Sequence, residues 1–302
     1  MRNEKVTSIT EAARFIKSGD IIIIGGFTIS MHPMALIRQI IRNKVNNLTV
    51  VGFSNGNDVD LLAAVGSVKQ VESSSVTFEM LGLAPNYRRA VQNGEIVVKD
   101  YTETTIAARA YAGSMGLTFY PTRALLGCDS VKYMPEIKEL KCPITGEFYH
   151  AIPALNADVA IFHAIAADAF GNVLYPQTGN SLAATEPMFS RAAKKVVVTV
   201  DKIVDHDVVL RNPEAVLIPG FEVDAVVELP FGAHPCGWPN IYEHDIDHLR
   251  EYMESSKNPE SLKKYLDRFV YEAEDHWDYL ERVGGLKRLM QLRLFPGGLN
   301  LL

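Results

Sequence analysis

The apolar residues of this 302-residue chain alternate between short continuous runs and stretches with helical spacing. Ile21 to Ile24 form an unbroken β-branched run, which is typical of a strand covered on both faces. Gly25-Gly26 interrupts that run, and helical spacing resumes over 34–41. The same alternation predicts further strands over 48–53, 68–76, 96–98, near 119, and over 159–165, 196–200 and 225–229, with helices over 8–19, 85–92 and 104–115. This order of elements predicts an α/β fold with an open, mostly parallel sheet and helices on both faces.

Two segments depart from this alternation. Residues 128–148 are rich in Lys, Glu, Pro and Gly without a clear period, and we expect an irregular excursion there. Residues 245–290 carry apolar positions at helical spacing among many charges, which predicts a helical C-terminal tail. We expect the tail to cover the sheet, although its aromatic residues leave a subunit contact open. Because no repeat or linker stands out, a single domain over 1–302 is expected.

Composition and charge narrow the class of protein. With 47% hydrophobic and 22% charged residues, the chain is typical of globular proteins. A net charge of −6 without clusters of Lys and Arg argues against nucleic acid as a partner. The N-terminus lacks the apolar stretch of a signal peptide, and the run over 21–24 is too short to cross a membrane, so we expect a cytoplasmic protein. Three cysteines at scattered spacing predict reduced thiols and no metal site.

Two short polar turns follow predicted strands. The segment Gly25-Gly26-Phe27-Thr28 lies between a buried strand and a helix, where ligands usually bind in open α/β sheets. Glycine lets backbone amides come close to an anionic group, but a two-glycine turn is more often only a tight connection. Ser54-Asn55-Gly56 follows the next strand and offers a second polar turn at the same edge.

Isolated charged and titratable residues near strand ends are weaker candidates. Glu79, Glu103 and Arg123 each lie near a predicted strand end, yet such residues are more often a solvated surface charge or part of a structural ion pair. His234 follows an apolar strand and His163 lies inside one. Since no nucleophile elbow accompanies them, we expect both histidines to be structural.

Several segments, in order along the whole chain, resemble the family of glutaconate CoA-transferase A (alpha-type) subunits, within the family I coenzyme A transferases. The segments are SGDIIIIGGFT, GLAPNYRRAVQNGEI, MGLTFYPTRALLG, AIPALNADVAIFHAIAADAFGNV, IPGFEVDAVVELPFGAHP, DHWDYLERVGG and FPGG. The resemblance implies a heteromeric enzyme that moves coenzyme A between an acyl-CoA thioester and a free (di)carboxylic acid. The coenzyme A thioester is then a substrate, and no permanently bound cofactor is expected.

The resemblance also implies how two chains divide the chemistry. In the two-chain members a glutamate of the B subunit is the nucleophile, held in a Ser-Glu-Asn-Gly-like turn, and covalent catalysis splits the exchange into easier steps. Ser54-Asn55-Gly56 resembles that turn without the glutamate. The chain is therefore expected to need a B-subunit partner. Gly25, Gly26 and Phe27 would shape the cleft and offer amides to the thioester oxygen, with Thr28 and Glu79 also expected at the binding site.

A second reading stays open on the same fold. Glu103, with Arg123 twenty positions later, resembles the acid and arginine of the steroid ring-cleaving CoA hydrolases. In such a hydrolase or lyase, Glu103 acts as a base without any partner nucleophile. The pair can also be a simple salt bridge, and a non-catalytic binding chain is the third reading.

Overall fold

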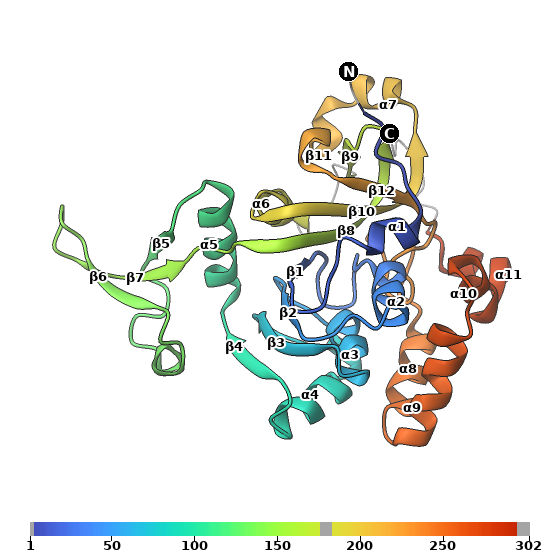
Figure 1. The fold of residues 1–302 in the computed structure, drawn as a ribbon, viewed down its shortest axis with the longest axis horizontal. Helices are drawn as coiled ribbons and strands as arrows, with labels where there is room; N and C mark the ends of the chain where they lie inside the picture. The colour runs from blue at the N-terminus through green and yellow to red at the C-terminus, as the bar shows by residue number, and fades with distance from the viewer. Residues whose placement is uncertain (1–2, 176–182, 295–302) are drawn as a thin grey trace.

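The apolar runs of the sequence form the centre of a mostly parallel sheet (Figure 1). The computed structural model describes residues 3–175 and 183–294, and within them the main sheet has nine strands. Its order is β11-β9-β8-β1-β2-β3-β4, with β10 on the other side of β8 and β12 beside β10. All neighbours run parallel except β8 with β9 and β9 with β11. The strands are β1 (Ile21–Ile24), β2 (Leu48–Val51), β3 (Val68–Ser73), β4 (Val97–Asp100), β8 (Ala157–Asp168), β9 (Val173–Leu174), β10 (Ala193–Val204), β11 (Val216–Ile218) and β12 (Ala225–Glu228).

Helices lie on both sides of this sheet. In Figure 1, α1 and α2 lie on the side of the C-terminal helices, whereas α5 and α6 lie on the opposite side. The predicted fold class is therefore confirmed. The helices are α1 (Ile9–Ala13), α2 (Met34–Arg42), α3 (Asn57–Ala64), α4 (Pro85–Gln92), α5 (Glu103–Ser114), α6 (Glu186–Arg191), α7 (His206–Arg211), α8 (Ile246–Ser255), α9 (Pro259–Leu266), α10 (His276–Arg282) and α11 (Gly285–Leu292), with a π-helical turn over Asp267–Tyr271.

Local signals explain why several helices begin where they do. The Ser8 hydroxyl accepts a hydrogen bond from the Glu11 amide at 3.2 Å and caps α1. Thr102 and Thr105 form a reciprocal capping box at the start of α5. The helical C-terminal tail is also confirmed, because α8 to α11 occupy the segment from Ile246 to Leu292.

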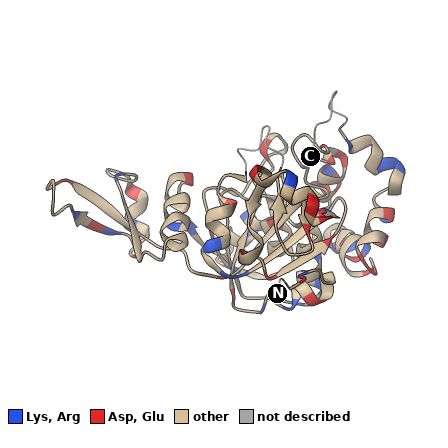
Figure 2. Ribbon diagram, turned by 90° about the horizontal axis from the view of Figure 1, so that it is seen from above, with Lys and Arg blue, Asp and Glu red and all other residues tan. Residues whose placement is uncertain are grey.

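The strand expected near Phe119 does not join the main sheet. It forms β5 (Phe119–Thr122), which pairs antiparallel with β7 (Phe148–Pro153), and β7 pairs antiparallel with β6 (Lys138–Lys141). These strands form an arm that projects from the body in Figures 1 and 2. The excursion expected to be irregular over 128–148 thus contains β6 and a 3-10 turn over Asp129–Tyr133. Strand β6 is largely exposed and charged, so it carried no apolar alternation that a sequence pattern could detect.

Acidic and basic residues are interspersed along the ribbon in Figure 2. Within residues 3–175 and 183–294, no helix is long and apolar enough to cross a membrane. The same residues contain no group of three His, Cys, Asp or Glu side chains arranged to hold a metal ion.

Candidate functional site

The loops that follow β1, β2 and β3 meet at the carboxyl edge of the sheet. The Thr28 amide donates to the Ser54 carbonyl at 2.9 Å, and the Asn55 amide donates to the Ser75 carbonyl at 2.9 Å. A side chain on Gly56 would collide with the Thr28 carbonyl, so glycine allows the loops to come this close. The two predicted turns are therefore direct neighbours in space, as expected for adjacent parallel strands.

Most amides of the Gly25-Gly26-Phe27-Thr28 segment already have backbone partners. Gly25 donates to the Ile161 carbonyl at 2.9 Å, and Phe27 donates to the Ser30 carbonyl at 2.9 Å. The Thr28 amide is taken by Ser54, as described above. The amide of Gly26 instead lies near the carboxyl group of Glu186 and opposes the rise in its pKa. Of the four amides in this segment, that of Gly26 is therefore the candidate hydrogen-bond donor to a ligand.

Gly26 occupies a position that accepts only glycine. Its φ is +102°, and an added Cβ would lie 2.6 Å from the Ser30 carbonyl oxygen and 2.8 Å from the His32 amide nitrogen. The buried imidazole of His32 also holds the turn, since Nδ1 lies 2.7 Å from the Gly25 carbonyl oxygen and Nε2 lies 3.0 Å from that of Thr28. The backbone geometry around Gly26 is thus fixed from several directions.

The second turn is held from inside by Asp58, near the start of α3. Asp58 accepts a hydrogen bond from the Asn55 side-chain amide at 2.6 Å and from the Gly56 backbone amide at 2.7 Å. Ser54, Asn55 and Gly56 are all buried. In this structure they shape the edge of the sheet, and their expected contact with a ligand stays a prediction.

More accessible groups lie beside these turns. Phe27 is half-buried and lies against Phe53, with 6.1 Å between the ring centroids. The Thr28 hydroxyl donates to the exposed carboxylate of Glu79. His244 is a neighbour that sequence patterns did not reveal: its Nε2 lies 2.9 Å from the Ser30 hydroxyl. Burial lowers the pKa of His244 despite the nearby Glu243 and Glu79, so its imidazole is neutral at neutral pH.

Glu186 is a second residue that the sequence did not indicate. Its side chain is buried, one carboxyl oxygen accepts a hydrogen bond from the Tyr175 hydroxyl, and the other has no hydrogen-bond partner among the described residues. Burial raises the pKa of Glu186 to about 8, although the Tyr175 hydroxyl and the Gly26 amide oppose that shift. A Cβ on Gly25 would lie 3.0 Å from the unpartnered oxygen. No local motif marks Glu186, and the short helix α6 that carries it was not predicted either.

Glu103 and Arg123 are not brought together. Glu103 is the first residue of α5, exposed at the same edge of the sheet as the two turns. Arg123 lies on the arm, where its guanidinium pairs with Glu147 at 3.3 Å and both side chains are well exposed. Among the described residues, no hydrogen bond or ion pair joins Glu103 to Arg123.

The two histidines predicted to be structural are buried and bonded on both ring nitrogens. His163 lies 2.8 Å from the Thr199 hydroxyl and 3.1 Å from an Asp201 carboxylate oxygen. His234 lies 2.7 Å from the Tyr279 hydroxyl and 3.1 Å from a carboxylate oxygen of Asp245. His234 therefore ties the loop after β12 to the C-terminal helices.

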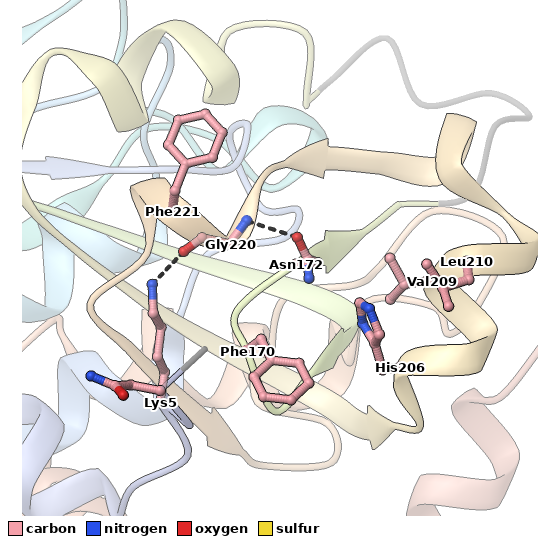
Figure 3. A pocket seen from close by; sticks show the side chains of 9 residues that line it. Lys5, Phe170, Asn172, His206, Val209, Leu210, Gly220 and Phe221 are labelled. Atoms are coloured by element: carbon pink, nitrogen blue, oxygen red, sulfur yellow. Dashed lines mark hydrogen bonds between the residues drawn. The ribbon is translucent and has the colours of Figure 1, made fainter. Parts of the chain in front are cut away.

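A cavity of about 450 Å³ lies elsewhere on the chain (Figure 3). It is lined by residues that include Lys5, Phe170 and Phe221, and none of the predicted site residues borders it. The Lys5 ammonium donates to the Gly220 carbonyl, and the Gly220 amide donates to the Asn172 side chain at 2.9 Å. These polar groups serve the packing of the chain, so the cavity carries no argument about the site.

Comparison with known proteins relates the whole chain to one group. A family model described as Coenzyme A transferase matches residues 6–229. The A subunit of glutaconate CoA-transferase from Acidaminococcus fermentans is 30% identical over 97% of this chain and 96% of its own length. The crystal structure of that enzyme superposes with a TM-score of 0.91 over 97% of this chain and 96% of the compared chain.

Other relatives differ in the activity their names state. A cholesterol ring-cleaving hydrolase IpdA subunit of Rhodococcus jostii is 29% identical over 91% of this chain and 95% of its own length. A crystal structure of a variant of the decarboxylase AibA/AibB superposes with a TM-score of 0.78, at 29% identity, over 89% of this chain and all of the compared chain. An uncharacterised protein of Archaeoglobus fulgidus is 39% identical over 96% of this chain, which spans 64% of that protein.

Proposed function

Because the chain belongs to the coenzyme A transferase family, we propose that it is the A-type chain of a two-chain enzyme that moves coenzyme A between an acyl-CoA thioester and a free carboxylic acid. The resemblance read from the sequence is confirmed at the level of the family and of its A-subunit type. A dicarboxylic acid as acceptor, the B-subunit partner and a cytoplasmic location belong to the proposal.

One observation carries this proposal: the similarity to the A subunit of glutaconate CoA-transferase extends over nearly the whole of both chains. The residues at the carboxyl edge of the main sheet are consistent with this proposal. The second turn, Ser54-Asn55-Gly56, has no acidic side chain, and its residues are buried. This turn therefore offers no attacking carboxylate, and the proposal takes that group from another chain.

The proposed chemistry proceeds by acyl transfer to that partner carboxylate. Its oxygen attacks the thioester carbonyl carbon, the carbon–sulfur bond breaks, and coenzyme A leaves as a thiolate, which yields an acyl-glutamyl anhydride. The thiolate then attacks the glutamyl carbonyl, which releases the first acid and forms a glutamyl-CoA thioester. The acceptor carboxylate repeats these steps in reverse.

Each attack places negative charge on a carbonyl oxygen. A backbone amide aimed at that oxygen lowers the barrier because the charge develops only in the transition state. Gly26 carries the amide of the first turn that has no backbone partner in the described part of the chain. The half-buried ring of Phe27 is placed to wall the same cleft.

The test combines this chain with a candidate B-type companion chain and measures coenzyme A exchange. Hydroxylamine or borohydride, added after acyl-CoA, should modify a glutamate of the companion chain and leave this chain unmodified. This chain alone is the control and should not exchange coenzyme A. Exchange by the purified single chain would contradict the proposal, as would a companion without an acidic residue at its strand-end turn.

A CoA-thioester hydrolase or lyase that uses Glu103 as base is the second candidate. Two observations favour it: Glu103 is exposed at the same edge as the two turns, and the chain is 29% identical to a cholesterol ring-cleaving hydrolase subunit. Arg123, however, pairs with Glu147 on the arm. Hydrolysis of acyl-CoA without an acceptor acid and without any trapped intermediate would favour this candidate.

A further inference from the structure

Glu186 differs from other buried carboxylates of the described chain in how little compensates it. Asp60 accepts hydrogen bonds from the backbone and side chain of Asn86, from the Tyr87 amide and from the Tyr252 hydroxyl. Asp245 is paired with the guanidinium of Arg288. Glu186 is only 1% exposed, yet within residues 3–175 and 183–294 it receives one side-chain hydrogen bond and leaves one oxygen without a partner. Such a site disfavours a charged carboxylate.

The carboxyl group of Glu186 lies beside the first turn, residues 25–28. Its unpartnered oxygen lies near Gly25, where an added Cβ would approach it to 3.0 Å. The Gly26 amide lies close enough to the same carboxyl group to oppose the rise in its pKa. Phe162 packs so closely to Gly25 that a Cβ there would collide with its ring. Glu186 thus lies between the core and the first turn, whose Gly26 amide has a role in the proposed function.

We propose that Glu186, as a neutral carboxylic acid, positions the Gly26 amide for the thioester carbonyl, and that ionisation of Glu186 switches the site off. The proposal rests on the proposed function and adds a pH-dependent positioning residue to it. A neutral acid accepts a weaker hydrogen bond from the amide than a carboxylate does, so the fixed amide keeps its donor strength for a developing oxyanion. A carboxylate would bind the amide strongly and would repel the oxyanion.

The charges around the turn support this state. Burial raises the pKa of Glu186 to about 8, so the carboxyl group keeps its proton at neutral pH. Tyr175 is bonded to it and stays neutral, because burial raises the pKa of this phenol as well. His32 lies against the Gly25 carbonyl. On α6, Arg191 is held at 2.7 Å by Glu222. No cation among the described residues forms an ion pair with Glu186.

The protonation of Glu186 can be tested on this chain without its partner. Infrared difference spectra at pH 7 between the wild type and Glu186→Gln should contain a protonated carboxylic acid band that disappears above pH 8. Stability to urea should fall from pH 5 to 8 in the wild type relative to Glu186→Gln. Between pH 4.5 and about 8, Glu186 keeps its proton in the folded state, whereas the unfolded state has lost it. Glu260→Gln removes an exposed glutamate, paired with Lys264, and is the matched control.

The positioning role is tested in the reconstituted pair. In the wild type, kcat/KM for acyl-CoA should fall about tenfold per pH unit above 8, whereas Glu186→Gln should be active and lack that limb of the profile. Glu186→Leu should lower kcat more than it raises KM, because no group then holds the Gly26 amide. A carboxylate band at pH 7, or the same alkaline limb in Glu186→Gln, would overturn the proposal. A pair without exchange at any pH removes the proposed function instead, while the infrared result still decides the state of Glu186.

Discussion

Replacement of Gly26 by alanine tests the backbone geometry on which the site depends. A residue with a side chain at φ of +102° is strained by about 1–2 kcal/mol. The added Cβ would also lie 2.6 Å from the Ser30 carbonyl oxygen, and such overpacking costs about 1–3 kcal/mol. Because that neighbour is backbone and is held by Phe27, it cannot move aside cheaply. Gly26→Ala should therefore destabilise the chain by about 2–5 kcal/mol.

Gly66→Ala is the matched control for this substitution. Gly66 also has a positive φ, +70°, but nothing lies within 4 Å of an added Cβ. Its replacement should cost only about 1 kcal/mol, from the backbone strain alone. Urea denaturation of the isolated chains gives both values, and coenzyme A exchange with the companion chain should survive only in Gly66→Ala. If the two variants lose the same stability, the close approach around Gly26 does not exist in solution and the reasoning fails.

Three further substitutions probe other parts of the chain. Glu103→Gln should leave coenzyme A exchange largely intact with the companion chain, and loss of all activity would favour Glu103 as a base. Burial alone raises the pKa of Asp245, but hydrogen bonds, including those from Arg288, outweigh it and hold the pKa well below its ordinary value of 3.8. In urea titrations, Asp245→Asn should thus lower the free energy of unfolding by about 3 kcal/mol at pH 7. The difference in free energy of unfolding between this variant and the wild type should shrink as the pH falls below 3.8. Glu72→Gln should cost about 3 kcal/mol in the same assay, because it leaves the buried guanidinium of Arg109 without its carboxylate; a loss below about 1 kcal/mol would mean that the pair is solvated.

The sequence by itself determined the class of fold and the order of most elements. The unbroken run at Ile21–Ile24 and the helical spacing over 34–41 are local patterns, and each is set by burial of neighbouring positions. The caps at Ser8 and Thr102 each join residues three positions apart, so they are local features as well. The position of the two polar turns at one edge of the sheet followed from the parallel order alone.

Tertiary structure decided what those turns can do. The amides of Gly25 and Thr28 donate hydrogen bonds to carbonyls far along the chain. Only the folded protein shows that the Gly26 amide has no such backbone acceptor among the described residues. Glu186 reaches the turn through α6, and Arg123 is carried away by β5, whose exposed strand pairs with β7 instead of joining the main sheet. The physical reason is that hydrogen-bond satisfaction and desolvation depend on groups brought together by packing. A local pattern of apolar and polar residues contains no information about those distant partners.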